Sequence, residues 1–228
     1  MAVILVRHGR STANTASVLA GRSPGIGLDD LGRQQAADLP ARLGERCADL
    51  VAVARSPLQR CAETVAPLVA DLSGVPEIVI DDLAEVDYGE WTNRPLAELA
   101  REPLWRTVQR QPSAAVFPGG EAMSAMANRA VTAVRELDAR YGGPEGSDLW
   151  VACTHGDIIK AVIADAMGLH LDGFQRIVVE PASLSVVRYH PRQTVVHTVN
   201  NTSRLSLPAP SAALAQTAVG GSTGTTEG

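Results

Sequence analysis

An arginine and a histidine close an apolar run near the beginning of the sequence, in Leu5-Val6-Arg7-His8-Gly9. A second apolar run, residues 149–154, is followed in the same way by His155-Gly156. Each run is typical of a buried strand, and each glycine lets the backbone turn where the strand ends. In open α/β sheets, sites lie beyond the carboxyl ends of the strands. The two motifs therefore predict histidine chemistry at one edge of a sheet.

Imidazole and guanidinium groups together suit phosphoryl transfer. A phosphoryl dianion must be held by several donors and attacked in line while its leaving oxygen is protonated. A neutral imidazole can be the nucleophile, and nearby arginines both bind the phosphoryl oxygens and disfavour protonation of the ring. These residue types therefore predict a phosphate-ester site.

The first motif, read onward as Arg7-His8-Gly9-Arg10-Ser11-Thr12-Ala13-Asn14, resembles the signature of the histidine phosphatase superfamily. That superfamily includes cofactor-dependent phosphoglycerate mutases and many phosphatases. The resemblance implies that His8 is the nucleophile that becomes a phosphohistidine, and that Arg7 clamps the phosphoryl group. Gly9, Ser11 and Asn14 would line the phosphate loop, although Ser11 and Asn14 equally suit local turn and cap hydrogen bonds.

Two further fragments occur in the order that the resemblance requires. The stretch Ser56-Pro57-Leu58-Gln59-Arg60-Cys61-Ala62-Glu63-Thr64 is similar to the family's S-x-x-x-R-A-x-x-T segment, with Cys61 in place of the usual alanine. It implies that Arg60 is the second clamp, near a helix N-terminus that also favours an anion. The fragment Thr154-His155-Gly156 implies that His155 and Gly156 bind the transferring phosphoryl group.

The proton donor is expected in residues 83–91, which resemble the family stretch that carries an acid/base glutamate. The resemblance places this role on Glu85, with Asp87 and Glu90 as rivals. A donor must be protonated to serve the leaving oxygen and then deprotonated to activate water. An acidic pH optimum is therefore expected.

The segment over the site favours a phosphatase within this family. Residues 104–112 lack the adjacent basic residues with which the mutases grip a substrate carboxylate, and residues 117–121 resemble the P-G-G-E turn of phosphatase branches. Arg94, Arg101, Arg106 and Arg110 leave open a second anionic group. The alternatives are a cofactor-dependent phosphoglycerate mutase and a non-catalytic protein that binds phosphorylated ligands.

Composition restricts the partners. The 228 residues carry a formal net charge of −5, which supplies no general basic field for nucleic acid. No apolar stretch approaches the roughly 20 residues that cross a bilayer, and no signal peptide is apparent, so a soluble cytoplasmic protein is expected. Three cysteines without metal-ligand spacing predict reduced thiols and no metal site. We expect no cofactor, a small-molecule phosphate ester as substrate, and a homodimer as one possible assembly.

The elements alternate between strands and helices, which indicates an α/β fold with a mostly parallel sheet. Together with the resemblance, this predicts a three-layer α/β/α sandwich of the phosphoglycerate mutase-like type. A helix is expected to begin at Ser56-Pro57, and a hairpin around His190-Pro191-Arg192. Residues 84–117 are expected as an irregular excursion across the sheet edge. The domain is expected to span residues 1–204, and the small and polar residues 205–228 to form a flexible tail.

Overall fold

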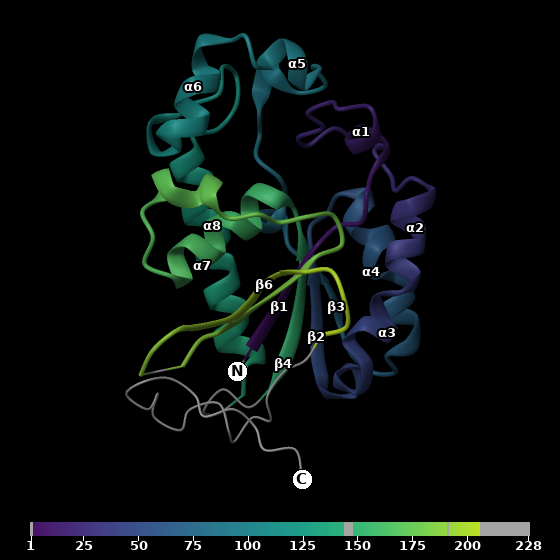
Figure 1. The fold of residues 1–228 in the computed structure, drawn as a ribbon. Helices are drawn as coiled ribbons and strands as arrows, with labels where there is room; N and C mark the ends of the chain where they lie inside the picture. The colour runs from purple at the N-terminus through teal and green to yellow at the C-terminus, as the bar shows by residue number, and fades with distance from the viewer. Residues whose placement is uncertain (1, 144–147, 191, 206–228) are drawn as a thin grey trace.

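The structure, a computed structural model, describes residues 2–143, 148–190 and 192–205. Figure 1 shows a central sheet with helices on both sides. The strands are β1 (Ala2–Arg7), β2 (Leu50–Arg55), β3 (Glu77–Val79), β4 (Leu149–Thr154), β5 (Leu184–Arg188) and β6 (Val195–Asn201). The α-helices are α1 (Thr12–Thr15), α2 (Asp30–Ala37), α3 (Leu39–Leu43), α4 (Gln59–Asp71), α5 (Leu96–Leu99), α6 (Pro103–Arg110), α7 (Met123–Tyr141) and α8 (Gly156–Ala166).

The six strands form one sheet in the order β3-β2-β4-β1-β5-β6. β1, β2, β3 and β4 run parallel to one another, whereas β5 pairs antiparallel with both β1 and β6. The expected mostly parallel sheet is thus confirmed. The expected hairpin is confirmed in its antiparallel pairing, while Pro191 lies outside the described residues.

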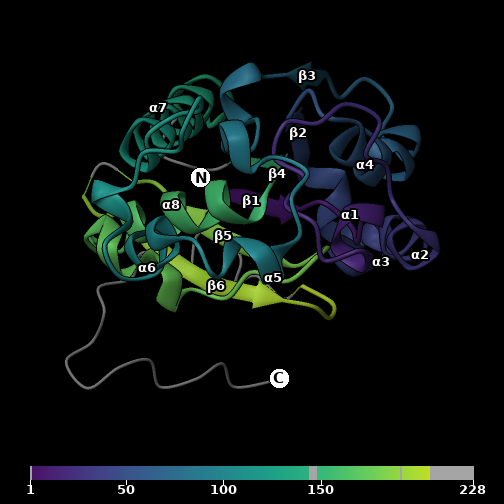
Figure 2. The same ribbon diagram turned by 90° about the horizontal axis from the view of Figure 1, so that it is seen from above.

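Alternation along β1 shows why the sheet is covered on both faces. Val3 and Leu5 pack into one core with the apolar sides of α7 and α8, and Ile4 and Val6 pack into another with α3 and α4. Successive side chains of a strand point to opposite faces, so a continuous apolar strand must be buried twice. The views from the side and from above agree on these three layers (Figures 1 and 2).

The excursion between β3 and α7 stands above the carboxyl ends of the parallel strands. It carries α5 and α6, which lie at the top of Figure 1, away from the N-terminal ends of the strands. Its 3₁₀ turn Gly89–Trp91 and helices α5 and α6 are short, as the scattered prolines in this stretch suggest. The expected irregular excursion is therefore confirmed.

One helix boundary was predicted wrongly. The helix α4 begins at Gln59, with Leu58 in extended conformation as its N-cap residue, and not at Ser56-Pro57. Ser56 instead continues the sheet edge, because its backbone N–H donates to the carbonyl of Cys153 at 3.0 Å. The serine hydroxyl accepts the backbone N–H of Leu58 at 3.3 Å and also contacts a neighbouring side chain, but it does not cap the helix.

The described chain continues one residue past the expected domain end. Leu205 is buried in the core that contains α3 and α4, and its N–H donates to the carbonyl of Arg42 at 2.8 Å. Residues 206–228, which make up the rest of the expected tail, lie outside the described residues. Within the described residues, no helix is long and apolar enough to span a membrane.

Candidate active site

The ends of two adjacent parallel strands bring the two motif histidines together. Arg7 of β1 is level with Thr154 of β4, and the N–H of His8 donates to the carbonyl of Thr154 at 3.0 Å. His8 and His155 each follow directly on their strand, and their ring centroids lie 5.1 Å apart. Both side chains are buried. Strand register therefore brings the two imidazoles together.

Arg60 bridges these two rings from the first turn of α4. Its Nε donates to Nε2 of His8 at 3.3 Å, and its Nη2 contacts Nδ1 of His155 at 3.1 Å. Nη2 also donates to the carbonyl of Gly21 at 2.9 Å. Among the described residues, the buried Nη1 of Arg60 has no hydrogen-bond partner. A charged donor with spare capacity therefore lies beside both histidines, as a phosphoryl oxygen requires.

The hydrogen bonds of His8 define which nitrogen can react. Nδ1 lies 2.7 Å from the carbonyl oxygen of Gly9, which can only accept, so Nδ1 carries the proton. Nε2 then holds the free lone pair that faces Arg60. Burial, followed by the charges of Arg60 and Arg7, holds the pKa of His8 well below its usual value. The ring is consequently neutral, with its basic nitrogen toward the guanidinium.

His155 is held neutral in the same way. Its Nε2 lies 2.8 Å from the hydroxyl of Ser56, while Nδ1 takes the hydrogen bond from Arg60. Burial and then the charge of Arg60 lower its pKa well below the usual value. Cys61, at the position where the family usually has alanine, places its sulfur 3.6 Å from His155 Nε2. The hydroxyl of Ser56 therefore orients this ring, which explains why the serine does not cap α4.

Gly9 turns the chain away from β1 through close backbone contacts. A Cβ atom at Gly9 would lie 2.8 Å from the carbonyl oxygen of Gly32, so no larger residue fits. The N–H of Gly9 donates to the hydroxyl of Thr64 at 2.9 Å, and that hydroxyl donates to the carbonyl of Arg60 at 2.6 Å. Thr64, the last residue of its motif, thus ties the loop after His8 to the helix that carries Arg60.

Arg7 and Gly156, the residues next to the two histidines in the chain, lie close to each other. Nη1 of Arg7 donates to the carbonyl of Val179 at 2.6 Å, and its buried Nε has no hydrogen-bond partner among the described residues. Gly156 begins α8, and a Cβ atom there would lie 3.5 Å from Nε of Arg7. The first amides of an α-helix and an arginine therefore meet beside His155, which favours an anion there.

Ser11 and Asn14 combine the two roles that the sequence left open. They form a capping box around the short helix α1, in which Asn14 N donates to Ser11 Oγ at 3.3 Å and Ser11 N to Asn14 Oδ1 at 3.0 Å. Both residues also line the cavity that contains His8. The cap hydrogen bonds are therefore present, and they hold the loop at the cavity wall.

The cavity has a volume of about 330 Å³ and contains one of the three acidic candidates. Glu85 lines it together with Arg7, His8 and Arg60. Burial, and then the negative charge of Asp157, raise the pKa of Glu85 to about 7. Among the described residues that line this cavity, neither Asp87 nor Glu90 occurs. The carboxylate of Asp87 instead accepts from the N–H of Gly89 at 3.0 Å, and Glu90 is exposed.

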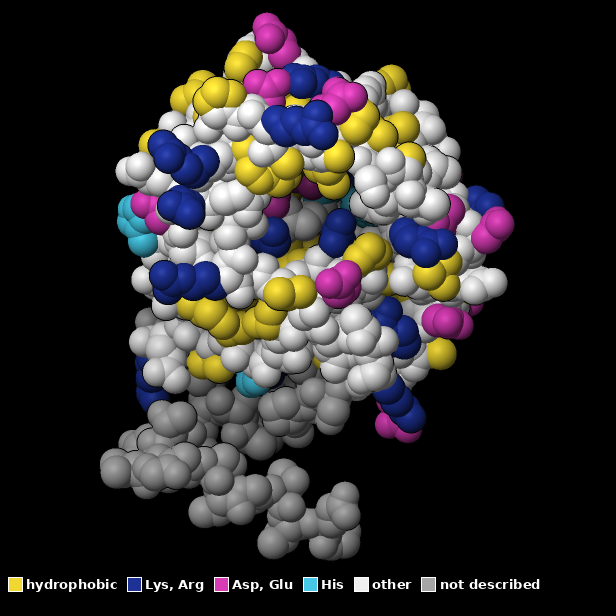
Figure 3. Space-filling model, turned by 45° about the horizontal axis from the view of Figure 1, so that its top comes forward, with side chains coloured by type: hydrophobic (Ala, Val, Ile, Leu, Met, Phe, Trp, Pro, Cys, Tyr) yellow, Lys and Arg dark blue, Asp and Glu magenta, His cyan; other side chains and the backbone are white. Residues whose placement is uncertain are grey.

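Beyond the histidines, the cavity has an apolar wall and a few polar groups that the motifs did not indicate. Figure 3 shows a hollow on this face, with basic side chains inside it and hydrophobic side chains around it. The apolar wall consists of Val18, Leu19, Ala20, Trp91, Leu96, Trp105, Val108, Phe117 and Val179. The additional polar groups are Tyr88, Gln109, Asp157, Lys160 and Gln175. Asp157 directly follows the Thr154-His155-Gly156 fragment, which is the one signal by which sequence reasoning could have found it.

The other histidines lie apart from this cavity. Nδ1 of His170 and Nδ1 of His190 accept backbone N–H groups two residues further along the chain. His197 lies on β6, and burial lowers its pKa. None of the three lines the cavity within the described part of the chain.

Comparison with curated proteins finds relatives of several activities. The chain is 29% identical over 205 residues to the "bifunctional protein Rv2228c" of Mycobacterium tuberculosis. The match covers 89% of this chain but 54% of that relative, so the chain spans about half of the relative's length. It is 27% identical to "phosphoserine phosphatase 1" of Hydrogenobacter thermophilus, with 89% of this chain and 93% of that protein covered. It is 28% identical to "probable phosphoglycerate mutase GpmB" of Yersinia pestis, with 91% and 96% covered.

Solved structures share the fold. The complex of a mycobacterial glucosyl-3-phosphoglycerate phosphatase with VO3 matches with a TM-score of 0.78 and 25% identity, over 88% of this chain and 99% of that one. The sequence pattern of the histidine phosphatase superfamily (branch 1) matches residues 3–202, which include both histidine motifs, Arg60 and Glu85. The chain therefore belongs to the histidine phosphatase superfamily, branch 1.

Proposed function

We propose that the protein is a metal-independent phosphomonoester hydrolase that works through a phosphohistidine on His8. The observation that carries the proposal is the tautomer of this residue. Its Nδ1 proton bonds to the carbonyl of Gly9, so that Nε2 is unprotonated beside the Arg60 guanidinium. A buried neutral imidazole within a cage of arginines is a nucleophile prepared for an anionic substrate.

The first chemical step transfers the phosphoryl group to the enzyme. Nε2 of His8 attacks phosphorus, the bond from phosphorus to the ester oxygen breaks, and Glu85 gives its proton to that oxygen. Arg7, Arg60 and the N-terminal amides of α8 hold the phosphoryl oxygens. The Gly9 carbonyl, which accepts the Nδ1 proton at 2.7 Å, stabilises the positive charge of the phosphorylated ring.

The second step regenerates the enzyme with water. The Glu85 carboxylate takes a proton from the attacking water, the bond between Nε2 and phosphorus breaks, and inorganic phosphate leaves with the lone pair of Nε2 restored. Glu85 must alternate between acid and base in one cycle, and a pKa of about 7 suits both roles near neutral pH. Glu85 ends the cycle protonated, as it began.

The cavity supports a small phosphate ester with an apolar body as substrate. Trp91 and Trp105 are stacked with ring centroids 6.1 Å apart, and both line the cavity beside Leu96. Lys160 lies at this wall, where its Nζ donates to Gln175 at 3.0 Å and pairs with the carboxylate of Asp157 at 3.5 Å. An alcohol with an apolar or aromatic face and one hydrogen-bond acceptor fits these groups.

A hydrolase is favoured over a mutase by the surroundings of the leaving group. Of the four arginines in residues 94–110, none is among the described residues that line the cavity, and Arg94 is paired with Glu102 at 2.7 Å. A mutase that works on phosphoglycerate needs cations for the carboxylate, and Lys160, the remaining cation among the described residues of the cavity wall, is already paired with Asp157 at 3.5 Å. It must also keep water from the phosphoenzyme, whereas a phosphatase must admit it.

The test is a phosphate-release screen on a panel of phosphate monoesters, run with a chelator on wild-type protein and on His8→Ala. We expect phosphate release by wild type, insensitivity to the chelator, and a loss on the order of 10⁴-fold in the variant. Rapid interconversion of 3- and 2-phosphoglycerate with negligible phosphate release would contradict the hydrolase. Wild-type binding of esters without turnover above that of His8→Ala would instead indicate a non-catalytic phospho-ligand protein.

A further inference from the structure

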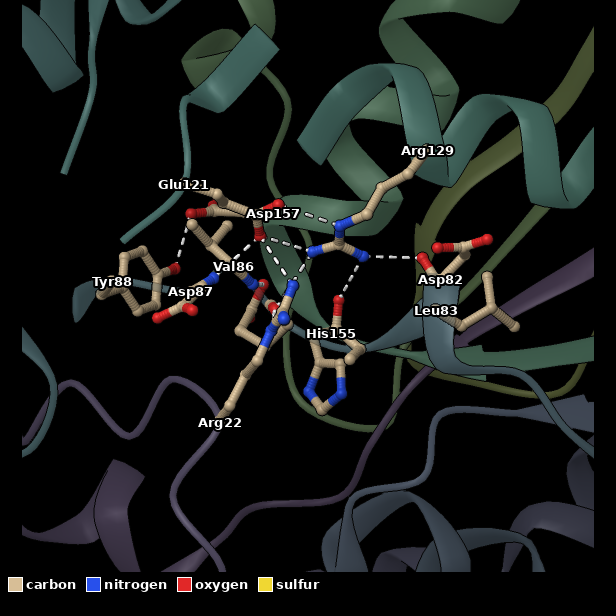
Figure 4. A network of polar contacts seen from close by, with 12 residues as sticks. Arg22, Asp82, Leu83, Val86, Asp87, Tyr88, Glu121, Arg129, His155 and Asp157 are labelled. Carbon is tan, nitrogen blue, oxygen red and sulfur yellow. Dashed lines mark hydrogen bonds and ion pairs between the residues drawn. The ribbon is translucent and has the colours of Figure 1, made fainter. Parts of the chain in front are cut away.

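A half-buried arginine far along the chain donates hydrogen bonds to the backbone that carries Glu85. Arg129 extends from α7, and its Nη1 donates to the carbonyls of Asp82 at 2.7 Å and Ala84 at 2.8 Å. Its Nη2 donates to the carbonyl of Glu85 at 3.1 Å. Figure 4 shows this guanidinium between the carbonyl groups of the 82–87 segment and the carboxylate of Glu121. One planar guanidinium group thus donates to three main-chain carbonyls of the irregular segment that follows β3.

Glu121 completes the grip from the turn before α7. Its two carboxylate oxygens accept from Nε of Arg129 at 3.1 Å and from Nη2 at 2.7 Å, a bidentate pair. The same carboxylate accepts the backbone N–H of Asp87 at 2.8 Å. Although burial raises the pKa of Glu121, the hydrogen bonds from Arg129 and the Asp87 amide bring it below its usual value. The carboxylate is therefore charged at neutral pH.

Arg22, in the loop that follows α1, contacts both the backbone of Glu85 and the carboxylate of Glu121. Its Nε donates to the carbonyl of Glu85 at 2.8 Å, and its Nη2 donates to Glu121 at 2.9 Å. The carbonyl of Glu85 thus receives two guanidinium hydrogen bonds, from Arg22 and from Arg129. We call Arg22, Glu121 and Arg129 the clamp.

The segment that carries Glu85 is anchored by the buried side chains of Val86 and Tyr88, but its backbone lies outside the sheet. Residues 85–88 belong to no helix or strand, so their backbone groups take no part in a regular ladder. The turns on either side touch directly, because a Cβ atom at Gly120 would lie 2.3 Å from the carbonyl oxygen of Asp87. Irregular backbone next to a cavity is mobile unless side chains fix it. The clamp supplies that fixation at the residues on both sides of the Glu85 side chain.

We propose that Arg129 and Glu121 are positioning residues for Glu85, whose loss slows protonation of the leaving group while substrate binding persists. The inference rests on the role of Glu85 in the proposed function. None of the clamp residues is among the described residues that line the cavity, and their direct hydrogen bonds go to the backbone around Glu85. General acids contribute about 10²- to 10⁴-fold, and a small displacement forfeits much of that.

The test compares two esters that differ in their need for a proton donor. An alkyl phosphate leaves as a strongly basic alkoxide and requires protonation, whereas p-nitrophenyl phosphate leaves as a stable phenolate. We expect Arg129→Met to lower kcat/KM for the alkyl ester about 100-fold and for p-nitrophenyl phosphate less than about 5-fold. Arg129→Lys keeps the charge but not the planar fork, and should fall between wild type and Arg129→Met.

The matched control is Arg135→Met, on the same helix, whose partner Asp165 lies outside the site. It should leave both rates within about 2-fold of wild type. Glu121→Gln provides a second route to the same result, and thermal unfolding of each variant identifies those that fold. If Arg129→Met does not fold, Arg129→Lys and Glu121→Gln decide the matter. The pH profile of Glu121→Gln should also show a displaced alkaline limb, which a purely structural role would not move.

Three outcomes would contradict the proposed positioning role: unchanged rates in the folded variants, equal losses for both esters, or changes confined to KM. If the proposed function itself is wrong, the kinetic results will differ from these three outcomes. In that case wild type itself would release no phosphate, or Glu85→Gln would leave the alkyl ester rate unchanged. The two inferences are therefore separable in one set of measurements.

Discussion

His8 and His155 follow directly on two paired strands, whereas Glu85 lies on irregular backbone after β3. The imidazoles owe their 5.1 Å spacing to the register between β1 and β4, which the sheet enforces over six residue pairs. The backbone on either side of the Glu85 carboxyl group is hydrogen-bonded by side chains from other parts of the chain, chiefly Arg129 and Glu121. The phosphoryl-binding half of the cavity is thus built on the most rigid part of the fold, and the proton-donating half on a separately fixed segment.

This difference suits the two tasks. The phosphoryl group and its transition state require fixed donors that need no reorganisation, which buried strand ends provide. The proton donor must take up and release a proton within one cycle and admit water to the phosphoenzyme. A segment held by a few side-chain hydrogen bonds can be adjusted without disturbing the sheet. We therefore expect variants of the two halves to show different kinetic signatures.

Among the variants that distinguish the two halves, the largest effect is expected when the proton donor is removed. Glu85→Gln should lower kcat/KM for alkyl phosphates by about 10³-fold, and the loss should diminish as the leaving group becomes more acidic. The pH profile sharpens this prediction. In wild type, kcat/KM should fall as the pH rises above about 7, because Glu85 loses its proton there. It should fall on the acid side only below the usual pKa of histidine, because burial and Arg60 lower the pKa of His8.

Steady-state kinetics from acid to alkaline pH will measure both limbs. Glu85→Gln should lose the alkaline limb and keep the acid one. Glu90→Gln is the control, since this exposed neighbour is absent from the described residues of the cavity wall. A flat wild-type profile, or an alkaline limb that survives in Glu85→Gln, would remove Glu85 from the mechanism.

A smaller but uniform effect is expected in the other half. Arg60→Lys retains the charge but cannot reach both imidazoles and the Gly21 carbonyl at once. We expect a loss of about 10²-fold in kcat/KM, the same for alkyl and p-nitrophenyl phosphates, because the donors act on the phosphoryl group and not on the leaving group. Arg33→Lys, at an exposed ion pair, is the control. A loss in kcat/KM that depends on the leaving group would contradict the separate roles assigned to the two halves.

The smallest effect is expected at the outer wall. Lys160→Met keeps the length of the side chain but removes its charge, and should raise KM about tenfold for aryl phosphates that carry a carboxylate. The parent aryl phosphates, which lack the carboxylate, should be hydrolysed nearly as before, which serves as the internal control. Equal changes in KM for the two series would show that Lys160 does not contact the leaving group.

Sequence reasoning succeeded where the position of a residue in the fold follows from a local pattern. The apolar runs that end in His8 and His155 predicted adjacent strand ends, because buried parallel strands read as continuous apolar segments. It failed at Ser56-Pro57, a pattern typical of a helix start, because the hydroxyl is engaged by His155 and the helix begins at Gln59. Secondary-structure propensity is a weak guide where a side chain is held by a tertiary contact.

The clamp and the outer wall lay beyond reach of the sequence for a different reason. Arg129 is 44 residues from Glu85 in the chain, yet donates to its carbonyl. One arginine among the many on helical surfaces carries no local pattern that distinguishes it. The P-G-G-E turn was recognised only as a family feature, and its physical role through Glu121 required the folded backbone. Long-range hydrogen bonds to main-chain carbonyls are not encoded in any short motif.

The central claim, a phosphohistidine on His8, is tested most directly by trapping the intermediate. Wild-type protein is mixed with a labelled aryl phosphate, quenched in alkali to preserve the phosphorus–nitrogen bond, digested, and mapped by mass spectrometry. We expect label on His8 alone, lost on acid treatment and absent from His8→Ala. Label on His155 or Ser11, or turnover with no trapped phosphoenzyme under any quench, would contradict the account.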